Sequence, residues 1–398
     1  MNSTANQHIS EKPVVPPEFH DICPFDDSCF HDKLRSLVKE PGFEHAIRYI
    51  MPDVDYQAFV DELLSVENQS DFQHRIMGNF LEMLVAKTTD GLSATGLENI
   101  SPDKSFTFLS NHRDIVLDAS FLNLCFIRAK VPLTQVAIGN NLLIYDWITD
   151  LVKLNRSFIV KRDVKKLQAL DAARQLSAYI HYTITKRNES VWIAQRQGRA
   201  KDSNDLTQES LLKMLAIAGD GDALENILEL NIVPVSISYE YDPNDYLKAK
   251  EYLLKRRDPE YKKSPHDDLL SMETGLLSPK GRVHFAIGKC INESLSKTTA
   301  TAKPVIVHEA CAIIDRTIHQ GYMIYPCNYI AYDKVNHSDE FAGKYTDADI
   351  ARFEEYINSH LAKVDVPDIT EEEREYMRHM MYSMYANPLK NKLAVSEN

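Results

Sequence analysis

The chain has 398 residues, of which 44% are hydrophobic and 26% are charged. That balance is typical of a soluble globular protein with a sizeable core, in one large or two ordinary domains. The formal net charge of −13 argues against nucleic acid as the main partner, because a phosphate backbone requires a basic protein face.

The N-terminal part of the sequence predicts a tail followed by helices. Residues 1–18 are polar and rich in proline, and we expect them to form a disordered tail. Within 19–98, apolar residues recur at intervals of three and four in the segments 31–38, 56–66 and 72–86, which indicates amphipathic helices. Glycine and Ser-Pro punctuation over 91–102 predicts a linker. We therefore expect a small helical N-terminal domain over 19–98.

From residue 99 to 345 the pattern changes to strands that alternate with helices. The candidate strands are 106–109, 134–138, 157–160, 191–194, 232–238 and 282–287. Helical patterns such as 167–186 and 207–218 lie between them. This alternation predicts an α/β fold, with a mostly parallel or mixed sheet covered by helices. Ligands of α/β folds with parallel sheets bind beyond the carboxyl ends of the strands. Residues 346–398 return to a helical pattern.

Targeting and cysteine patterns favour a cytoplasmic protein. No apolar run reaches the length of a membrane span, and the N-terminus lacks the apolar core of a signal peptide. None of the six cysteines forms a C-x-x-C pair, so we expect free, mostly buried thiols in a reducing compartment. A lipid substrate would then be reached from the surface, and the protein could be peripheral on the inner face of a membrane.

The segment NHRDIVLD at 111–118 is the strongest candidate for chemistry. It follows the predicted strand 106–109 and precedes a predicted helix. Histidine titrates near neutrality, and a nearby carboxylate can fix its tautomer and stabilise the imidazolium. His112 is therefore a candidate general base, oriented by Asp114 or Asp118. We favour Asp118, because Asp114 is also well placed to cap the following helix.

Three further segments complete a series with this motif. They are RSFIVKR at 156–162, WIAQRQGRAK at 192–201 and IVPVSISYE at 232–240. The series resembles the glycerolipid acyltransferase family, whose pattern is N-H-x(4)-D, a strand ending in basic residues, E-G-x-R-S, and a strand with I-V-P-V. Residues 281–291 resemble the family's closing strand, so the resemblance spans roughly residues 100 to 291.

The resemblance implies transfer of a fatty acyl group to glycerol-3-phosphate or a lysophosphatidate-like acceptor, in phospholipid biosynthesis. The acyl donor would be acyl-CoA or acyl-carrier protein. The sequence departs from the pattern in three ways: five residues separate His112 from Asp118, Gln197 stands in place of the family's Glu, and Arg199 follows Gly198 directly. These departures leave open a non-catalytic lipid-binding or scaffold protein on the same fold, or an O-acyltransferase that acts on a different lipid, for example an amino-acid lipid.

The residue inventory fits acyl transfer from a thioester. A thioester is already activated, so the reaction needs a base for the hydroxyl proton and no protein nucleophile; the sequence contains no G-x-S-x-G motif. A phosphate on the acceptor requires fixed cationic donors, and Gly198 would allow close approach of the ligand. The candidate cations are Arg113, Lys161, Arg162, Arg196, Arg199 and Lys201. A solvated loop with surface ion pairs is the alternative for these side chains, and we propose no metal and no cofactor.

Two peripheral segments each permit two interpretations. The basic stretch 248–263 could be a solvated helix face, or a dock for an anionic membrane surface or an acidic acyl-carrier protein. The run 376–385 is rich in Met and Tyr, and could pack in a core or cover an acyl chain.

Overall fold

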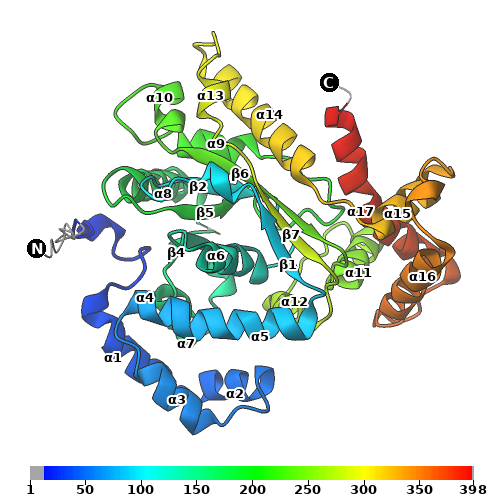
Figure 1. The fold of residues 1–398 in the computed structure, drawn as a ribbon, viewed down its shortest axis with the longest axis horizontal. Coiled ribbons are helices and arrows are strands. Elements are labelled where there is room, and N and C mark those ends of the chain that lie inside the picture. The colour runs from blue at the N-terminus through cyan, green and yellow to red at the C-terminus, as the bar shows by residue number, and fades with distance from the viewer. Residues whose placement is uncertain (1–12, 163, 397–398) are drawn as a thin grey trace, which may run out of the picture.

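The computed structural model describes residues 13–162 and 164–396. Its centre is a seven-stranded sheet with the order β1-β7-β6-β2-β5-β3-β4 (Figure 1). The strands are β1 (Leu92–Thr95), β2 (Thr107–Ser110), β3 (Gln135–Gly139), β4 (Ser157–Val160), β5 (Val191–Ala194), β6 (Ile232–Tyr239) and β7 (Val283–Ile287). All neighbouring pairs are parallel except β6 and β7. The predicted α/β class with a mostly parallel, mixed sheet is confirmed.

All six predicted strands are present, and the sequence missed a seventh. Strand β1 lies where 91–102 predicts a linker, and it pairs in parallel with β7 at the edge of the sheet. Its residues are alternately half-buried and exposed, because only one face of an edge strand packs on the core. Four residues with two hydroxyl side chains carry too little apolar signal to distinguish such a strand from a loop.

Helices cover both faces of the sheet (Figure 1). One face packs against α8 (Lys166–Thr185), α9 (Glu209–Leu215), α10 (Ala223–Leu228) and α14 (Lys303–Gly321), through a core that includes Ile180, Leu212 and Ile314. The other face packs against α5 (Gly78–Thr88) and α6 (Leu117–Ala129), through residues such as Leu84 and Phe126. Burial on both faces explains why β2 and β6 read as continuous apolar runs.

The N-terminal helices form a layer beside the sheet. They are α1 (Asp27–Leu37), α2 (Pro41–Ile50), α3 (Tyr56–Leu64) and α4 (Gln69–Asp71), and α4 continues through a π-helical turn, η2 (Phe72–Met77), into α5. Their apolar side chains surround Leu154 and Trp147 of α7 (Asp146–Leu154). That 19–98 forms a domain of its own remains a prediction, as does the tail at 1–18, of which residues 1–12 lie outside the described chain.

The last part of the described chain is helical, as the sequence pattern of residues 346–398 predicts. Its elements are α15 (Pro326–Asn336), α16 (Asp347–Leu361) and α17 (Glu371–Ser396), which pack with α11 (Asp245–Arg257) around Met377, Met381 and Tyr385. The Met- and Tyr-rich run 376–385 therefore packs in a core. The remaining elements are α12 (Pro265–Leu277), α13 (Asn292–Leu295) and the short helices η1 (Pro17–Phe19), η3 (Leu97–Asn99), η4 (Asn140–Leu142) and η5 (Ala342–Lys344). In the described chain, none of the helices has the length and apolarity that a bilayer crossing requires.

Candidate active site

Asn111 fastens the end of β2 to the neighbouring strand β6. Its side-chain amide donates to the carbonyl of Ile237 at 3.0 Å, and the backbone N–H of Ile237 donates to its Oδ1 at 2.8 Å. Asn111 is fully buried, and these two bonds satisfy an amide that would otherwise be costly to bury. The loop that carries His112 therefore leaves the sheet from a fixed point.

His112 is oriented by Asp118, the carboxylate that the sequence favoured. Its Nδ1 lies 2.8 Å from Oδ2 of Asp118. The same oxygen accepts the backbone N–H groups of Arg113 at 2.6 Å and Asp114 at 3.1 Å. An acceptor at Nδ1 keeps the proton of neutral imidazole on that nitrogen, so Nε2 is the basic atom. The imidazole also meets the ring of Trp192 edge-on, with centroids 5.8 Å apart.

Asp114 has a different environment from Asp118, four residues away. Its Oδ1 accepts the backbone N–H groups of Val116 at 2.9 Å and Leu117 at 2.8 Å, at the start of α6. Burial, together with the neighbouring charge of Asp118, raises the pKa of Asp114. A Cβ on Gly275 of α12 would lie 1.9 Å from Oδ2 of Asp114. Asp114 thus caps α6 beneath α12.

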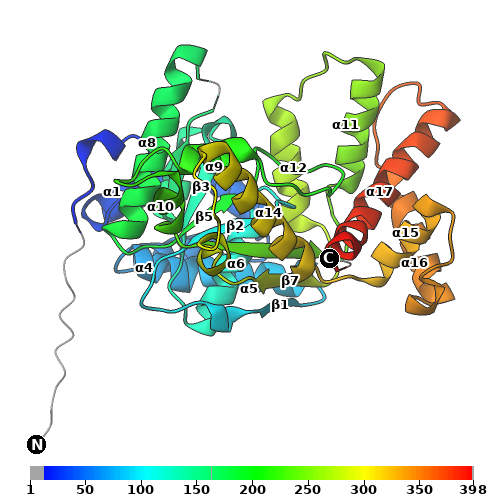
Figure 2. The same ribbon diagram turned by 90° about the horizontal axis from the view of Figure 1, so that it is seen from above.

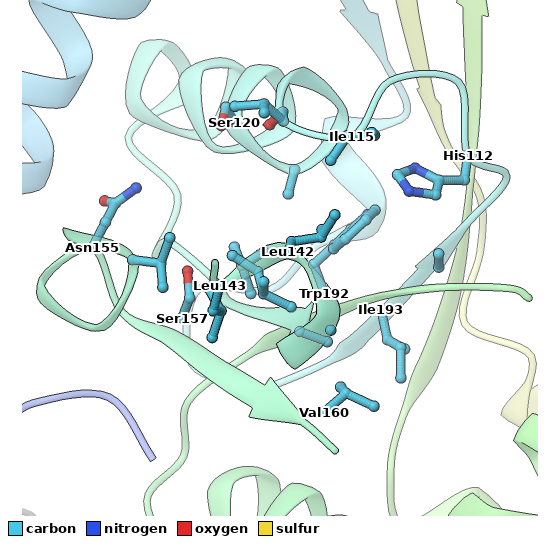
Figure 3. Close-up of a pocket in the computed structure, with 18 of the residues that line it drawn as sticks. His112, Ile115, Ser120, Leu142, Leu143, Asn155, Ser157, Val160, Trp192 and Ile193 are labelled. Atoms are coloured by element: carbon cyan, nitrogen blue, oxygen red, sulfur yellow. Dashed lines mark hydrogen bonds between the residues drawn. The ribbon is translucent and has the colours of Figure 1, made fainter. Parts of the chain in front are cut away.

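His112 lies at one end of a cavity of about 530 Å³ (Figure 3). The cavity lies between α6, α7 and the ends of β3, β4 and β5, and its walls are mainly apolar. The side chains that line it, from these elements and the loops beside them, include Ile115, Val116, Ala119, Leu142, Leu143, Ile148, Leu151, Val160, Trp192 and Ile193. Gln73 and Met77 of the π-helical turn line it as well, and π-helical turns are frequent at functional sites.

Three of the predicted cations line this same cavity: Lys161, Arg162 and Arg196. Lys161 is paired with Asp21 at 2.5 Å. Arg162 lies so close to Gly139 that a Cβ there would be 2.7 Å from its Nε. Both follow β4, where the sequence placed them, whereas Arg196 follows β5.

Arg113 lies outside this cavity. Its Nη2 is 2.6 Å from Oδ2 of Asp205 in a buried ion pair, and the hydroxyl of Tyr322 donates to the same oxygen at 2.6 Å. Arg113 and Tyr322 also border a small second cavity of about 30 Å³. The sequence suggested that Arg113 binds substrate; its observed contacts instead hold the His112 loop against the segment before α9 and against the end of α14.

The remaining predicted cations gather with α11 and α12. Gly198 has a φ of 71°, a left-handed conformation that glycine adopts without strain, and it turns the chain toward Arg199 and Lys201. Lys201 pairs with Glu251, and the same carboxylate faces Lys255 at 3.0 Å and Lys263 at 3.3 Å.

This group of three lysines around one carboxylate has a local excess of positive charge. Burial and the neighbouring cations, Lys255 first among them, lower the pKa of Lys201 to about 7. Arg199 is close enough to Lys201, Lys263 and Asp114 for its charge to affect their pKa values. We call Arg199, Lys201, Lys255 and Lys263 the basic cluster.

Sequence reasoning missed several of these contributors. It placed Lys255 and Lys263 in a peripheral basic stretch over 248–263, either a solvated helix face or a dock, and it gave no role to Glu251, Trp192 or Gly275. In the structure five of the seven basic side chains of that stretch face carboxylates, two of them on α17. The position of Trp192 at the start of the segment 192–201 was an available signal; nothing in the sequence showed that α11 and α12 would approach residue 199.

Gln197 stands where the family pattern has Glu. Its backbone N–H donates to Oε1 of Gln208 at 2.8 Å, and its side chain is exposed. The turn is therefore held through its backbone. Within the described chain, no three His, Cys, Asp or Glu side chains gather as metal ligands would.

Comparison with known proteins gives similarity at the level of distant solved structures. No protein-family profile matches the sequence, and no curated protein shows significant similarity to it. The crystal structure of the 1-acyl-sn-glycerophosphate (LPA) acyltransferase PlsC from Thermotoga maritima matches with 14% identity and a TM-score of 0.35, over 72% of this chain and 92% of that one. A similarity at this level is one of fold alone.

Proposed function

We propose that this protein is an acyltransferase that forms an ester between a fatty acyl group and the hydroxyl of a phosphate-bearing glycerol acceptor. The acyl donor would be acyl-CoA or acyl-carrier protein, and the acceptor glycerol-3-phosphate or a lysophosphatidate-like molecule. The observation that carries the proposal is the His112–Asp118 pair at the end of a mainly apolar cavity of about 530 Å³.

The proposed reaction needs only one proton carrier. Nε2 of His112 takes the proton of the acceptor hydroxyl as its oxygen attacks the thioester carbonyl. The C–O bond forms, the C–S bond breaks, and the imidazolium returns the proton to the leaving thiolate. Asp118 holds the imidazole in the tautomer that makes Nε2 basic, and stabilises its charged form.

The two substrates have different requirements, and the site offers a region for each. An acyl chain fits the cavity walls, because burial of apolar surface is favourable by about 25 cal/mol per Å². The acceptor phosphate fits the basic cluster, where Arg199 offers a fork of donors and the lysines offer point charges. Arg196 lines the cavity on the same loop and would help to hold either phosphate or donor.

The experiment that tests this proposal is incubation of the purified chain with labelled acyl-CoA or acyl-carrier protein and a panel of acceptors. We expect release of free thiol and a labelled ester with glycerol-3-phosphate or lysophosphatidate. His112→Ala should lower turnover by roughly 10²–10⁴-fold, the usual worth of general-base catalysis. Activity of His112→Ala within about threefold of wild type would contradict the assignment, on the same scale.

The cavity also suits a second candidate, a lipid-binding protein without turnover. The replacement of Glu by Gln197 in the third segment favours that alternative. Tight binding of fatty acid or lysophosphatidate, without thiol release for any acceptor, would support it.

A further inference from the structure

Two helical projections extend from the same side of the molecule (Figure 2). They lie beyond the ends of β4 and β6, which run parallel to β2 and β5 in the sheet. Helix α8 runs from the end of β4 back to the start of β5. Its 20 residues span about 30 Å, whereas four-residue strands span about 13 Å, so the first turns of α8 extend beyond the sheet. Helices α11 and α12 project on the same side and are joined at their tip by 258–264.

The tip of α8 exposes apolar side chains. Leu167 is 92% exposed and Leu170 is 52% exposed. Residues three apart are neighbours on one helix face, so the two leucines form one small apolar patch. Single exposed leucines are ordinary on protein surfaces, but this pair lies at the far end of a projecting helix.

The same end of the molecule leads to the candidate active site. Val160, Lys161 and Arg162, which precede α8, line the cavity that contains His112, and Leu176 of α8 lines it two turns beyond Leu170. The exposed leucines therefore lie on the helix that supplies part of the cavity wall.

Each projection carries an exposed lysine, in a chain whose net charge is −13. Other cations of these segments are paired with carboxylates, among them Lys161 with Asp21 and Lys255 with Glu251. Lys165 and Lys262 are exposed. Near an anionic lipid surface, each such cation contributes about 1 kcal/mol of attraction. Apolar side chains flanked by cations fit the interface of an anionic bilayer.

We propose that the tip of α8 docks on an anionic phospholipid bilayer. Leu167 and Leu170 enter the boundary between head groups and acyl chains, while Lys165 and the α11–α12 tip lie among the head groups. The side of the sheet that carries the two projections then faces the bilayer, so a lipid substrate reaches the cavity without crossing water. The reason for such docking rests on the proposed function, but the docking itself is a binding event and is measured without turnover.

The test is sedimentation of the purified full chain with vesicles of phosphatidylcholine alone, and of equal parts phosphatidylcholine and phosphatidylglycerol. We expect binding to the anionic vesicles that weakens as salt rises, because salt screens surface charge. Leu167→Gln combined with Leu170→Gln should lower the bound fraction roughly tenfold or more, because each leucine loses apolar burial in the bilayer. Val305→Gln is the matched control, since Val305 is an exposed apolar residue (46%) on α14, and it should bind as wild type does.

Two results would overturn the proposal. One is equal vesicle binding by wild type and the double leucine variant. The other is no vesicle binding by wild type, with the leucines instead needed for self-association or for capture of an acidic carrier protein. Turnover of a water-dispersed, short-chain substrate should be the same in wild type and the double variant; its absence in both would count against the proposed function while leaving the docking result intact.

Discussion

A single oxygen atom organises the candidate active site at the scale of residues. Oδ2 of Asp118 accepts from the His112 ring and from two backbone N–H groups, so the loop and the imidazole are fixed together. Asp114, four residues earlier, is buried against Gly275 and has a raised pKa. Two carboxylates of one motif thus have separate tasks because their environments differ.

The two carboxylates should respond differently to removal of their charge. We expect Asp118→Asn to lower turnover by about 10²–10⁴-fold, because the imidazolium loses its counter-charge. Asp114→Asn retains an oxygen acceptor for the cap of α6, and should leave turnover within a few-fold of wild type. Steady-state kinetics with both variants checks this prediction; an inactive Asp114→Asn with an active Asp118→Asn would assign the orienting role to Asp114.

Asp114 should also make stability depend on pH. Its folded-state pKa lies above the ordinary value of 3.8. Its contribution to stability is therefore fully present below that value and is lost as pH rises through the folded-state pKa. Asp114→Asn cannot titrate, so the free energy of unfolding of wild type, measured with denaturant, should fall relative to that of the variant as pH rises across this range. Parallel curves for the two proteins would show that folding does not raise the pKa of Asp114.

Lys201 should make binding of the acceptor phosphate sensitive to pH near neutrality. Its pKa is lowered to about 7, so its positive charge is present below that pH and is lost above it. We expect the affinity for glycerol-3-phosphate to weaken as pH rises through about 7, and Lys201→Arg to reduce this dependence, because Arg remains charged. Calorimetric titration of both proteins across this range compares the same ligand, so the ligand's own ionisation cancels.

At the scale of elements, α12 acts as a cover over the His112 loop. The cover requires a glycine at 275, because any side chain there would meet Asp114. The same pair of helices, α11 and α12, brings Lys255 and Lys263 to the basic cluster. The segment between β6 and β7 therefore both covers the His112 loop and contributes cations.

Gly275→Ala tests this packing. In an open helix, alanine would be more stable than glycine by about 1 kcal/mol. Here we expect a loss of about 1–3 kcal/mol, the usual cost of overpacking. Asp114→Ala removes the clashing side chain, so Gly275→Ala should cost far less in that background, a non-additivity typical of residues in contact. Equilibrium unfolding of the two single variants and the double variant provides the cycle, and additive losses would contradict the contact.

At the scale of the whole molecule, the cavity forms only when several segments of the chain pack together. Its walls come from the N-terminal helices, the sheet, α6, α7 and α8, so no single segment contains it. In Figure 3, Ser120 and Asn155 lie away from His112 toward the other end. The length of the cavity should therefore limit the acyl chain that fits.

Ser120→Phe should shorten the acyl chain that the protein accepts. We expect the ratio of kcat/KM for long-chain to short-chain donors to fall by roughly 10-fold or more, because several methylenes lose their place at about 0.8 kcal/mol each. Ser120→Ala keeps the cavity open and is the control. An unchanged chain-length profile for Ser120→Phe would mean that the acyl chain lies elsewhere.

The sequence by itself determined the α/β class, six of the seven strands, and the His112 motif at the end of β2. These features follow from local patterns: apolar runs, their period, and a histidine with carboxylates a few residues away. Only the tertiary structure decided the rest. It placed Arg113 in a buried ion pair with Asp205, 92 residues later in the chain, and gathered Lys201, Lys255 and Lys263 around Glu251. It also added β1 to an edge of the sheet. Contacts between distant segments depend on how helices pack over the sheet, and packing leaves no periodic signal in the chain.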